Sequence, residues 1–270
     1  MILFSNRIKI PVSKELNIAA TIAEQAGATL LKYFGKTLNI RYKDRINLVT
    51  KADREAEKNI VRKLQKAFPA YGILAEEGTT VEANTKWIID PLDGTTNYAH
   101  GYPIFCVSIA LEREGEIVLG VIYDPVRKEM FSAERGYGAV LNRNKMHVSK
   151  IRSLGRALLV TGFAYDVHTS PDNNLDHFAN FILKAQAVRR DGSAALDLAY
   201  LACGRFDGFW ELKLHPWDTA VGSLFVTEAG GKITDFQGGP FSIYGQETLA
   251  SNGLLHGAMR NVLSLALPKG

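Results

Sequence analysis

The spacing of apolar residues changes along the 270-residue chain, and this change constrains the fold more than any other feature of the sequence. In the first part of the chain, apolar residues recur three and four positions apart, which is the spacing of an amphipathic helix. This spacing predicts one helix from Ser13 to Phe34, where Gly35 acts as a stop, and a second from about Ala52 to Ala67, which Pro69 closes. The chain is therefore expected to begin with two helices.

The middle and the end of the chain follow different patterns. Short apolar, β-rich runs predict strands at 73–75, 87–89, 105–111, 117–123 and 158–161, and the step Glu114-Gly115 is typical of a hairpin turn. Helical spacing returns at 176–187, 194–202, 219–229 and 254–265, with strands at 232–236 and 248–251. Helices, then a strand-rich block, then alternating strands and helices predict a layered, mixed α/β architecture.

The composition is that of an ordinary globular protein, with 46% hydrophobic and 22% charged residues. At ~150 residues per domain, the length predicts one large domain or two closely packed halves. The net charge of +4 is too slight to predict nucleic acid or an acidic membrane as the main partner. The basic run from Arg143 to Lys150 is interpreted as a solvated strand edge or turn rather than an RNA-binding patch.

The ends and the cysteines of the chain predict a cytoplasmic protein. Residues Met1 to Pro11 lack the apolar segment of about 7 to 15 residues that a secretory signal needs. No apolar run approaches the ~18 residues that a membrane span needs. Cys106 and Cys203 are the two cysteines, their spacing is not typical of zinc ligands, and both are expected to be reduced core residues.

The segment from Trp87 to His100 carries the most specific chemical signal. An apolar strand is expected to deliver Asp90 at its carboxyl end, Pro91 stiffens the following turn, and Asp93 comes three positions later before a Gly-Thr-Thr run that can open a helix. Carboxylate oxygens suit Mg²⁺, and backbone N–H groups at a helix start suit a phosphate. A bare D-x-x-D pattern is more often a solvated turn, but the full string is far rarer.

This segment resembles the first signature of the inositol monophosphatase family, and further segments match in family order from about Glu15 to Leu265. They are Leu48-Val-Thr50 with Asp53, Ile73-Leu-Ala-Glu-Glu77, Gly162-Phe163, Val188-Arg189 with Gly192-Ser-Ala194, and Trp217-Asp218 with Glu228-Ala-Gly-Gly231. The resemblance implies an α/β/α/β/α sandwich of the inositol monophosphatase and fructose bisphosphatase type. It also implies a single domain over 1–270, with pseudo-halves of about 1–150 and 151–270, and a homodimer.

The resemblance implies two or three Mg²⁺ ions and the residues that hold them. These are four carboxylates and one backbone carbonyl, namely Glu76, Asp90, Asp93, Asp218 and the carbonyl of Leu92. Taken alone, Asp218 is more typical of a helix N-cap and Glu76 of a solvated strand end. Four acids that converge without a cation would repel one another strongly, which favours the metal interpretation.

The same resemblance assigns the catalytic and phosphate-binding roles. Thr95, held near Glu76, would orient and deprotonate the attacking metal-bound water, while Gly94 and Thr96 would sit against the phosphate together with Thr95. The chemistry is consistent with metal catalysis, because water next to Mg²⁺ becomes a better nucleophile.

The segment from Arg189 to Ser193 resembles the part of the family that contacts the sugar or polyol. Counting back from Gly192-Ser193-Ala194 selects Arg189 rather than Arg190, Ala194 offers a backbone contact, and Glu211 would accept substrate hydroxyls. The alternative is a solvated arginine pair and a surface glutamate.

Two positions depart from the family pattern. Asn47 stands where an acid usually precedes Leu-Val-Thr, so a third metal would be held weakly, since an amide oxygen can ligate Mg²⁺ without contributing charge. Val221 stands where a small residue is common, so the packing of that helix is expected to differ slightly.

These observations predict Mg²⁺-dependent hydrolysis of a polyol or sugar phosphomonoester, with inositol monophosphate as the first candidate. One alternative is a sister phosphatase that acts on fructose 1,6-bisphosphate, histidinol phosphate or a 3'-phosphonucleotide. Another is a regulatory protein that uses the same fold to bind RNA or transcription machinery. The intact acid set favours catalysis, because a regulatory protein has no need for four mutually repelling carboxylates.

Overall fold

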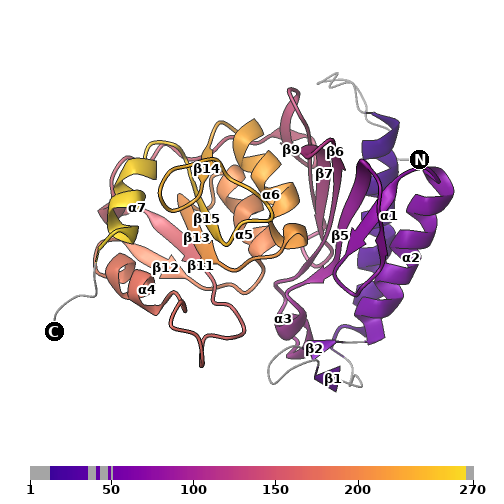
Figure 1. Cartoon of the computed structure of the whole chain (residues 1–270), viewed down its shortest axis with the longest axis horizontal. Coiled ribbons are helices and arrows are strands. Elements are labelled where there is room, and N and C mark those ends of the chain that lie inside the picture. The colour runs from indigo at the N-terminus through magenta and orange to yellow at the C-terminus, as the bar shows by residue number, and fades with distance from the viewer. Residues whose placement is uncertain (1–12, 36–40, 43–47, 50, 266–270) are drawn as a thin grey trace.

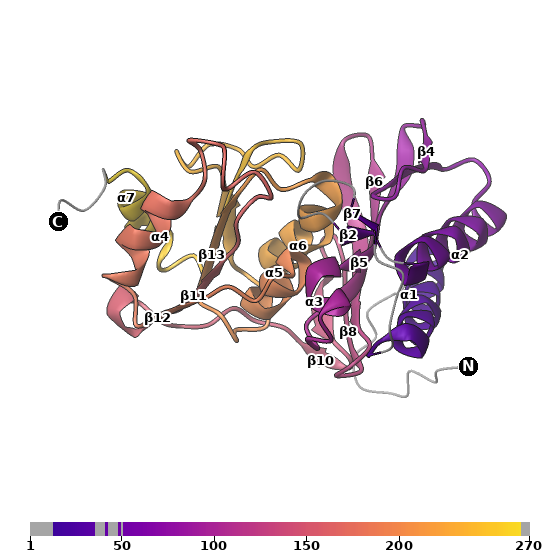
Figure 2. The same ribbon diagram turned by 90° about the horizontal axis from the view of Figure 1, so that it is seen from below.

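Two β-sheets and three layers of helices alternate in the order helix, sheet, helix, sheet, helix (Figures 1 and 2). The computed structural model describes residues 13–35, 41–42, 48–49 and 51–265. Helices α1 and α2 cover the outer face of the first sheet, α5 and α6 fill the space between the sheets, and α4 and α7 cover the outer face of the second. The predicted five-layered sandwich is confirmed. Among the described residues, no helix is long and apolar enough to cross a membrane.

The first sheet has eight strands, and all neighbours in it are antiparallel except β3 and β5. In spatial order they are β10 (Asn144–Lys145), β9 (Gly138–Leu141), β8 (Glu129–Glu134), β7 (Glu116–Asp124), β6 (Cys106–Arg113), β5 (Thr85–Asp93), β3 (Gly72–Ala75) and β4 (Thr80–Val81). The predicted hairpin joins β6 to β7 through Glu114 and Gly115, which both have positive φ, as a tight two-residue turn requires. A separate pair consists of β1 (Arg41–Tyr42) and β2 (Leu48–Val49).

Both predicted N-terminal helices are present, as α1 (Lys14–Tyr33) and α2 (Lys51–Ala67). The side chain of Ser13 caps α1 by accepting a hydrogen bond from the backbone N–H of Leu16 at 3.2 Å. The apolar faces of the two helices pack with the buried residues of β5 and β6 in one cluster around Trp87. This packing buries one face of the first sheet and leaves the other face for the central helices.

The second sheet has five strands, with a parallel part and an antiparallel part. In spatial order they are β12 (Ala187–Arg189), β11 (Leu158–Thr161), β13 (Gly208–Leu212), β15 (Glu247–Ser251) and β14 (Lys232–Thr234). Outside it lie α4 (Leu175–Ile182) and α7 (His256–Leu263). A short 3-10 turn, η1 (Leu154–Arg156), precedes β11.

The central layer consists of α5 (Ala194–Ala202) and α6 (Pro216–Glu228), which pack against each other and touch both sheets. Because both faces are covered, residues 195–202 of α5 are all buried. Val221 of α6 fits against Gly120 of β7, where an added Cβ would lie 2.8 Å from the valine side chain. The larger residue at position 221 is therefore accommodated by a glycine on the facing strand.

Several predicted boundaries are corrected. The helix predicted over 176–187 ends at Ile182, because Ala187–Arg189 instead forms β12 and pairs in parallel with β11. The strand predicted at 87–89 extends to Asp93, so Asp90 lies within β5 rather than at its end. Cys106 is buried and Cys203 is partly buried, and both are free thiols. Asn47 and Thr50 lie outside the described residues.

Candidate active site

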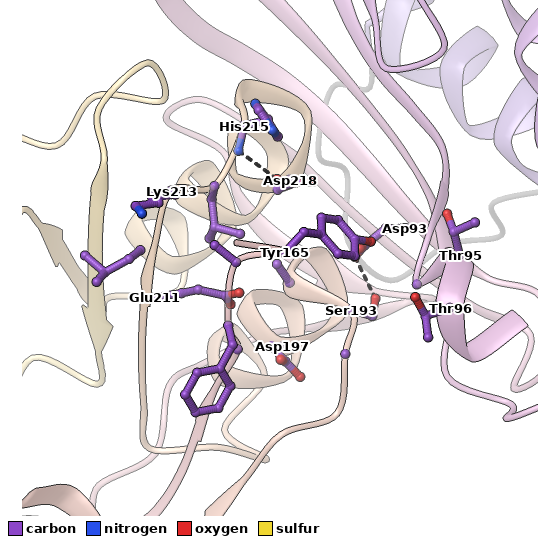
Figure 3. Close-up of a pocket in the computed structure, with 18 of the residues that line it drawn as sticks. Asp93, Thr95, Thr96, Tyr165, Ser193, Asp197, Glu211, Lys213, His215 and Asp218 are labelled. Atoms are coloured by element: carbon purple, nitrogen blue, oxygen red, sulfur yellow. Dashed lines mark hydrogen bonds between the residues drawn. The ribbon is translucent and has the colours of Figure 1, made fainter. Parts of the chain in front are cut away.

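A pocket of about 620 Å³ lies where the first sheet, the central helices and the edge of the second sheet meet (Figure 3). Its wall is built from five segments that are far apart in the sequence. These are the end of β5 with the start of α3 (Thr95–Ala99), the loop after β11, the segment leading into α5, the end of β13 with the start of α6, and Glu76 after β3. The first of these segments belongs to the motif that the sequence singled out.

Three carboxylates converge in this pocket. One oxygen from each of Asp90, Asp93 and Asp218 lies within 4.8 Å of the others. A regular strand turns alternate side chains to opposite faces, so residues three apart on β5 would point away from each other. The pairing of β5 with β6 shifts register between Asp90 and Asp93, and this irregularity lets both side chains reach the same side. The predicted convergence of these three acids is therefore present.

Asp93 is anchored by the start of α5. Its Oδ2 accepts a hydrogen bond from the Ser193 hydroxyl at 2.6 Å and another from the backbone N–H of Ala195 at 2.8 Å (Figure 3). Asp93 is 8% exposed and Ser193 is 1% exposed, so these bonds form away from bulk water. A carboxylate of the first sheet therefore fixes the beginning of a helix whose sequence lies more than 100 positions away.

The turn from β5 into α3 is held by its own polar groups. The backbone N–H of Leu92 donates to Asp90 Oδ1 at 2.9 Å, and the Thr95 hydroxyl donates to the Leu92 carbonyl at 2.9 Å. Gly94 has φ of 95°, and a Cβ there would lie 2.8 Å from the carbonyl oxygen of Ile104. Only glycine fits this turn, and it brings Thr95 and Thr96 to the pocket wall.

Asp218 occupies the third position of α6. Its Oδ2 accepts a hydrogen bond from the backbone N–H of His215 at 2.7 Å, which forms one half of a capping box. His215, not Asp218, is therefore the N-cap of α6, while the Asp218 side chain both completes the capping box and converges with Asp90 and Asp93.

Glu76 lines the pocket, while the next residue faces elsewhere. The backbone N–H of Glu77 donates to Glu57 Oε2 at 2.7 Å, and the Glu77 carboxylate lies 3.7 Å from Arg54. This separation agrees with the sequence-based choice of Glu76 over Glu77.

The electrostatics of the cluster favour a bound cation. Burial raises the pKa of Asp90 well above its ordinary value, and the neighbouring charges of Glu76, Asp93 and Asp218 raise it further. The pKa of Asp218 is also raised well above its ordinary value by burial and by Asp93 and Glu76. The pKa of Asp93 is raised by burial, although the hydrogen bond from Ser193 opposes this. Such carboxylates stay ionised only with a nearby positive charge, which a hard divalent ion supplies.

Glu211 stands on the opposite wall, at the end of β13 (Figure 3). It is 7% exposed, and burial together with the charge of Asp93 raises its pKa to about 8. The close approach of Gly162 shapes this wall, because a Cβ on Gly162 would clash with the Glu211 carboxylate. Ala194, at the first position of α5, also lines the pocket.

The arginine in the pocket wall is Arg190, not the predicted Arg189. Arg189 closes β12, is exposed, and donates from Nη1 to the carbonyl of Val188 at 3.3 Å. Successive residues of an extended chain point to opposite sides, so only one of two adjacent arginines can face the pocket. Counting along the motif could not settle which one it is.

Tyr165, Asp197 and Lys213 are among the further pocket residues that sequence reasoning missed. Lys213 donates from Nζ to Asp166 Oδ2 at 2.8 Å and to Ser170 Oγ at 2.7 Å, and so ties the loop after β11 to the end of β13. Asp197 was detectable, because it is the single charged residue in the otherwise uncharged helix α5.

Comparisons with known proteins show the family of the chain. A model of the inositol monophosphatase family matches residues 12–265. An inositol-1-monophosphatase from Synechocystis sp. is 44% identical over 253 residues, which cover 92% of this chain and 88% of that protein. The Nus factor SuhB of Xylella fastidiosa is 45% identical over 227 residues, which cover 83% of this chain and 82% of that protein.

A solved structure has the same fold. The extragenic suppressor protein suhB from Bartonella henselae superimposes with a TM-score of 0.90 at 40% sequence identity, and the match covers 94% of this chain and 100% of that chain. The arrangement of layers around the pocket is therefore shared with a natural relative.

Proposed function

The chain belongs to the inositol monophosphatase family, and from this membership we propose that it is a Mg²⁺-dependent phosphatase that hydrolyses inositol monophosphate to inositol and phosphate. One observation carries the proposal. A cluster of three carboxylates, suited to a metal ion, shares one pocket with a buried glutamate that is suited to hydroxyl groups.

The residues present fit a hard divalent cation. Oxygens of Asp90, Asp93 and Asp218 lie within 4.8 Å of one another, and burial followed by the charges of the neighbouring acids raises the pKa of Asp90. Glu76 and the Leu92 carbonyl would complete the donor set for two or three Mg²⁺, and Asn47 would belong to a weak third site. When bound, Mg²⁺ supplies positive charge that stabilises the transition state and makes an adjacent water more acidic.

The residues at the start of α3 would position the reacting groups. Gly94, Thr95 and Thr96 would hold the phosphate against the pocket wall, which all three line. Because the Thr95 proton is donated to the Leu92 carbonyl at 2.9 Å, the hydroxyl oxygen is left to accept a hydrogen bond from the attacking water and orient it. Glu76 would receive the water proton. The water oxygen then bonds to phosphorus as the bond to the alcohol oxygen breaks, and a second water would protonate the departing alkoxide so that the alcohol leaves neutral.

The substrate's alcohol part would lie against Glu211, Arg190 and the backbone of Ala194. Hydrogen bonds to ring hydroxyls discriminate strongly between substrates, because a buried polar group without its partner is costly. Cations bound beside Asp93 would favour the ionised form of Glu211, and an anionic carboxylate in this wall would oppose a second phosphate, so inositol monophosphate is preferred over fructose 1,6-bisphosphate.

We also propose that the chain is one domain of two pseudo-halves and acts as a homodimer in the cytoplasm. The resemblance to the family supports the dimer, and the free thiols of Cys106 and Cys203 are compatible with a reducing compartment. Light scattering of the purified protein measures the oligomeric state. Elution at the mass of one chain would contradict the dimer.

A phosphate-release assay tests the proposed reaction. Inositol 1-phosphate, fructose 1,6-bisphosphate, histidinol phosphate and a 3'-phosphonucleotide are compared in Mg²⁺ and in EDTA. We expect Mg²⁺-dependent release with the highest kcat/KM for inositol 1-phosphate. We also expect Glu211→Gln to lower the ratio of kcat/KM for inositol 1-phosphate over the bisphosphate. Release that is independent of Mg²⁺, or a preference for the bisphosphate in wild type, would contradict the proposal.

A further inference from the structure

One carboxyl group in the pocket has no role in the mechanism above. Asp197 is 2% exposed and lines the pocket, yet its Oδ1 has no hydrogen-bond partner among the described residues. Figure 3 shows its carboxyl group near Ser193 and on the same side of the pocket as Glu211. Buried polar atoms are nearly always hydrogen-bonded. An unpaired carboxyl oxygen on a pocket wall is therefore a position at which a ligand can complete the pairing.

Asp197 lies in the first turn of α5, where the helix dipole favours an acid, but the described residues offer its buried Oδ1 no hydrogen-bond partner. Helix α5 has the sequence Ala-Ala-Leu-Asp-Leu-Ala-Tyr-Leu-Ala, and its other members from 195 to 202 are buried and uncharged. An apolar residue would be more stable in such a helix, because burying a carboxyl group without a partner is unfavourable. Asp197 comes three residues after Ala194, so the helix places both on one face. That face contributes Ala194 and Asp197 to the pocket.

The charges around Asp197 select the kind of ligand. Burial raises its pKa well above the ordinary value, the acids Asp191, Glu211 and Asp93 raise it further, and Arg190 opposes them. A phosphate would be repelled by the acids, and an ammonium group would be repelled by Arg190. A neutral hydroxyl both donates and accepts, so it pairs with the carboxyl group in either protonation state. The environment therefore favours a hydroxyl group.

We propose that Asp197 binds one hydroxyl of the substrate while Glu211 binds another, so that the pocket selects phosphomonoesters of polyols that present two free hydroxyls to this wall. The inference rests on the proposed function, because it assigns a further specificity-determining residue to the same reaction. It makes recognition of the alcohol part depend on two carboxyl groups from different layers, β13 and α5.

The experiment compares two substrates that differ in their alcohol part. Inositol 1-phosphate carries ring hydroxyls, whereas para-nitrophenyl phosphate has none. Asp197→Ala is expected to lower kcat/KM for inositol 1-phosphate about 10-fold or more, mainly through KM, because one hydrogen bond to a carboxyl group is lost. The same variant should change kcat/KM for para-nitrophenyl phosphate by no more than about twofold, since that substrate makes no such bond.

Two further variants separate recognition from structural damage. Asp197→Asn keeps the size and hydrogen-bonding capacity of the side chain. We expect it to lower kcat/KM for inositol 1-phosphate less than the alanine variant does. Asp207→Asn is the matched control. Asp207 is also buried, but it accepts from the backbone N–H of Leu158 at 2.7 Å and from Ser149, and it does not line the described pocket. This control is expected to lower thermal stability without changing the ratio between the two substrates.

Inositol phosphates that each lack one hydroxyl provide a second measurement. For one of these analogues, the wild-type kcat/KM is expected to be lower than that for inositol 1-phosphate by about the factor that Asp197→Ala causes with inositol 1-phosphate. In the Asp197→Ala variant, this analogue and inositol 1-phosphate should have about the same kcat/KM. Equal losses on both substrates, or an unchanged kcat/KM for inositol 1-phosphate, would overturn the role of Asp197 and leave the phosphatase standing. A wild type that releases phosphate from neither substrate would overturn the proposed function together with this inference.

Discussion

Replacing Glu211 by glutamine is expected to stabilise the metal-free protein, by an amount that grows with pH. Glu211 is 7% exposed, and burial together with the nearby charge of Asp93 raises its pKa to about 8 from an ordinary value of 4.5. The folded protein therefore keeps a proton on this carboxyl group that the unfolded chain has already released. Because the unfolded chain binds fewer protons, folding stability falls as pH rises from about 4.5 to about 8.

The size of the effect follows from the two pKa values. They differ by about 3.5, and each unit corresponds to about 1.4 kcal/mol. The shifted pKa of Glu211 lowers the free energy of unfolding by about 1 kcal/mol at pH 5 and by about 3 kcal/mol at pH 7. This decrease levels off near 5 kcal/mol above pH 8. Glutamine has nearly the same shape and cannot ionise. The advantage of Glu211→Gln over wild type should therefore be about 2.5 kcal/mol larger at pH 7 than at pH 5.

Urea unfolding in EDTA at pH 5, 6, 7 and 8 measures this difference directly. The other pocket acids titrate in both proteins, so the comparison isolates position 211 and its coupling to them. Glu116→Gln is the matched control, because it removes the same carboxylate from a side chain that is 69% exposed. An advantage of Glu211→Gln that does not change with pH, or that follows the Glu116 control, would refute the reasoning.

Three other outcomes are expected. Asp90→Asn should abolish most Mg²⁺-dependent phosphate release while the metal-free fold melts no earlier than wild type, because one member of a repelling cluster is gone. Thr95→Ala should lower kcat more than it raises KM, and a change confined to KM would reduce Thr95 to a phosphate ligand. Gly162→Ala should lower kcat/KM in the phosphate-release assay, because its Cβ would displace the Glu211 carboxylate from its place in the pocket wall. Gly257→Ala is its control, since nothing lies within 4 Å of the added atom.

The fold was predictable where local patterns are long and uniform. The spacing of apolar residues located α1 and α2, and the run at 194–202, which is small or apolar except for Asp197 and Tyr200, gave the bounds of α5. The pattern failed at β12, because Phe181, Ala185 and Val188 continue the helix-like spacing of four and three residues past the end of α4. Parallel pairing of β12 with β11 decides its conformation, and a local pattern does not contain that partner.

The site was predictable to the extent that its residues sit in motifs. Asp90, Asp93 and Asp218 were found from their segments, but only the fold shows that their oxygens lie within 4.8 Å. Arg190 was missed because motif counting gives a position along the chain and not the side to which a residue points. Its neighbour Arg189 has the same chemistry but does not line the described pocket.

The contact between Asp93 and α5 links the metal cluster to the substrate wall. Asp93 Oδ2 accepts hydrogen bonds from Ser193 and from the backbone of Ala195, at the start of the helix that presents Ala194 and Asp197 to the pocket. Any change in charge or position at Asp93 therefore acts on the helix that contributes to hydroxyl recognition. Because a cation beside Asp93 would favour its ionised form, it would also strengthen the bonds that it accepts from α5. If the proposed roles hold, metal binding and recognition of the alcohol part both depend on the Asp93 carboxylate.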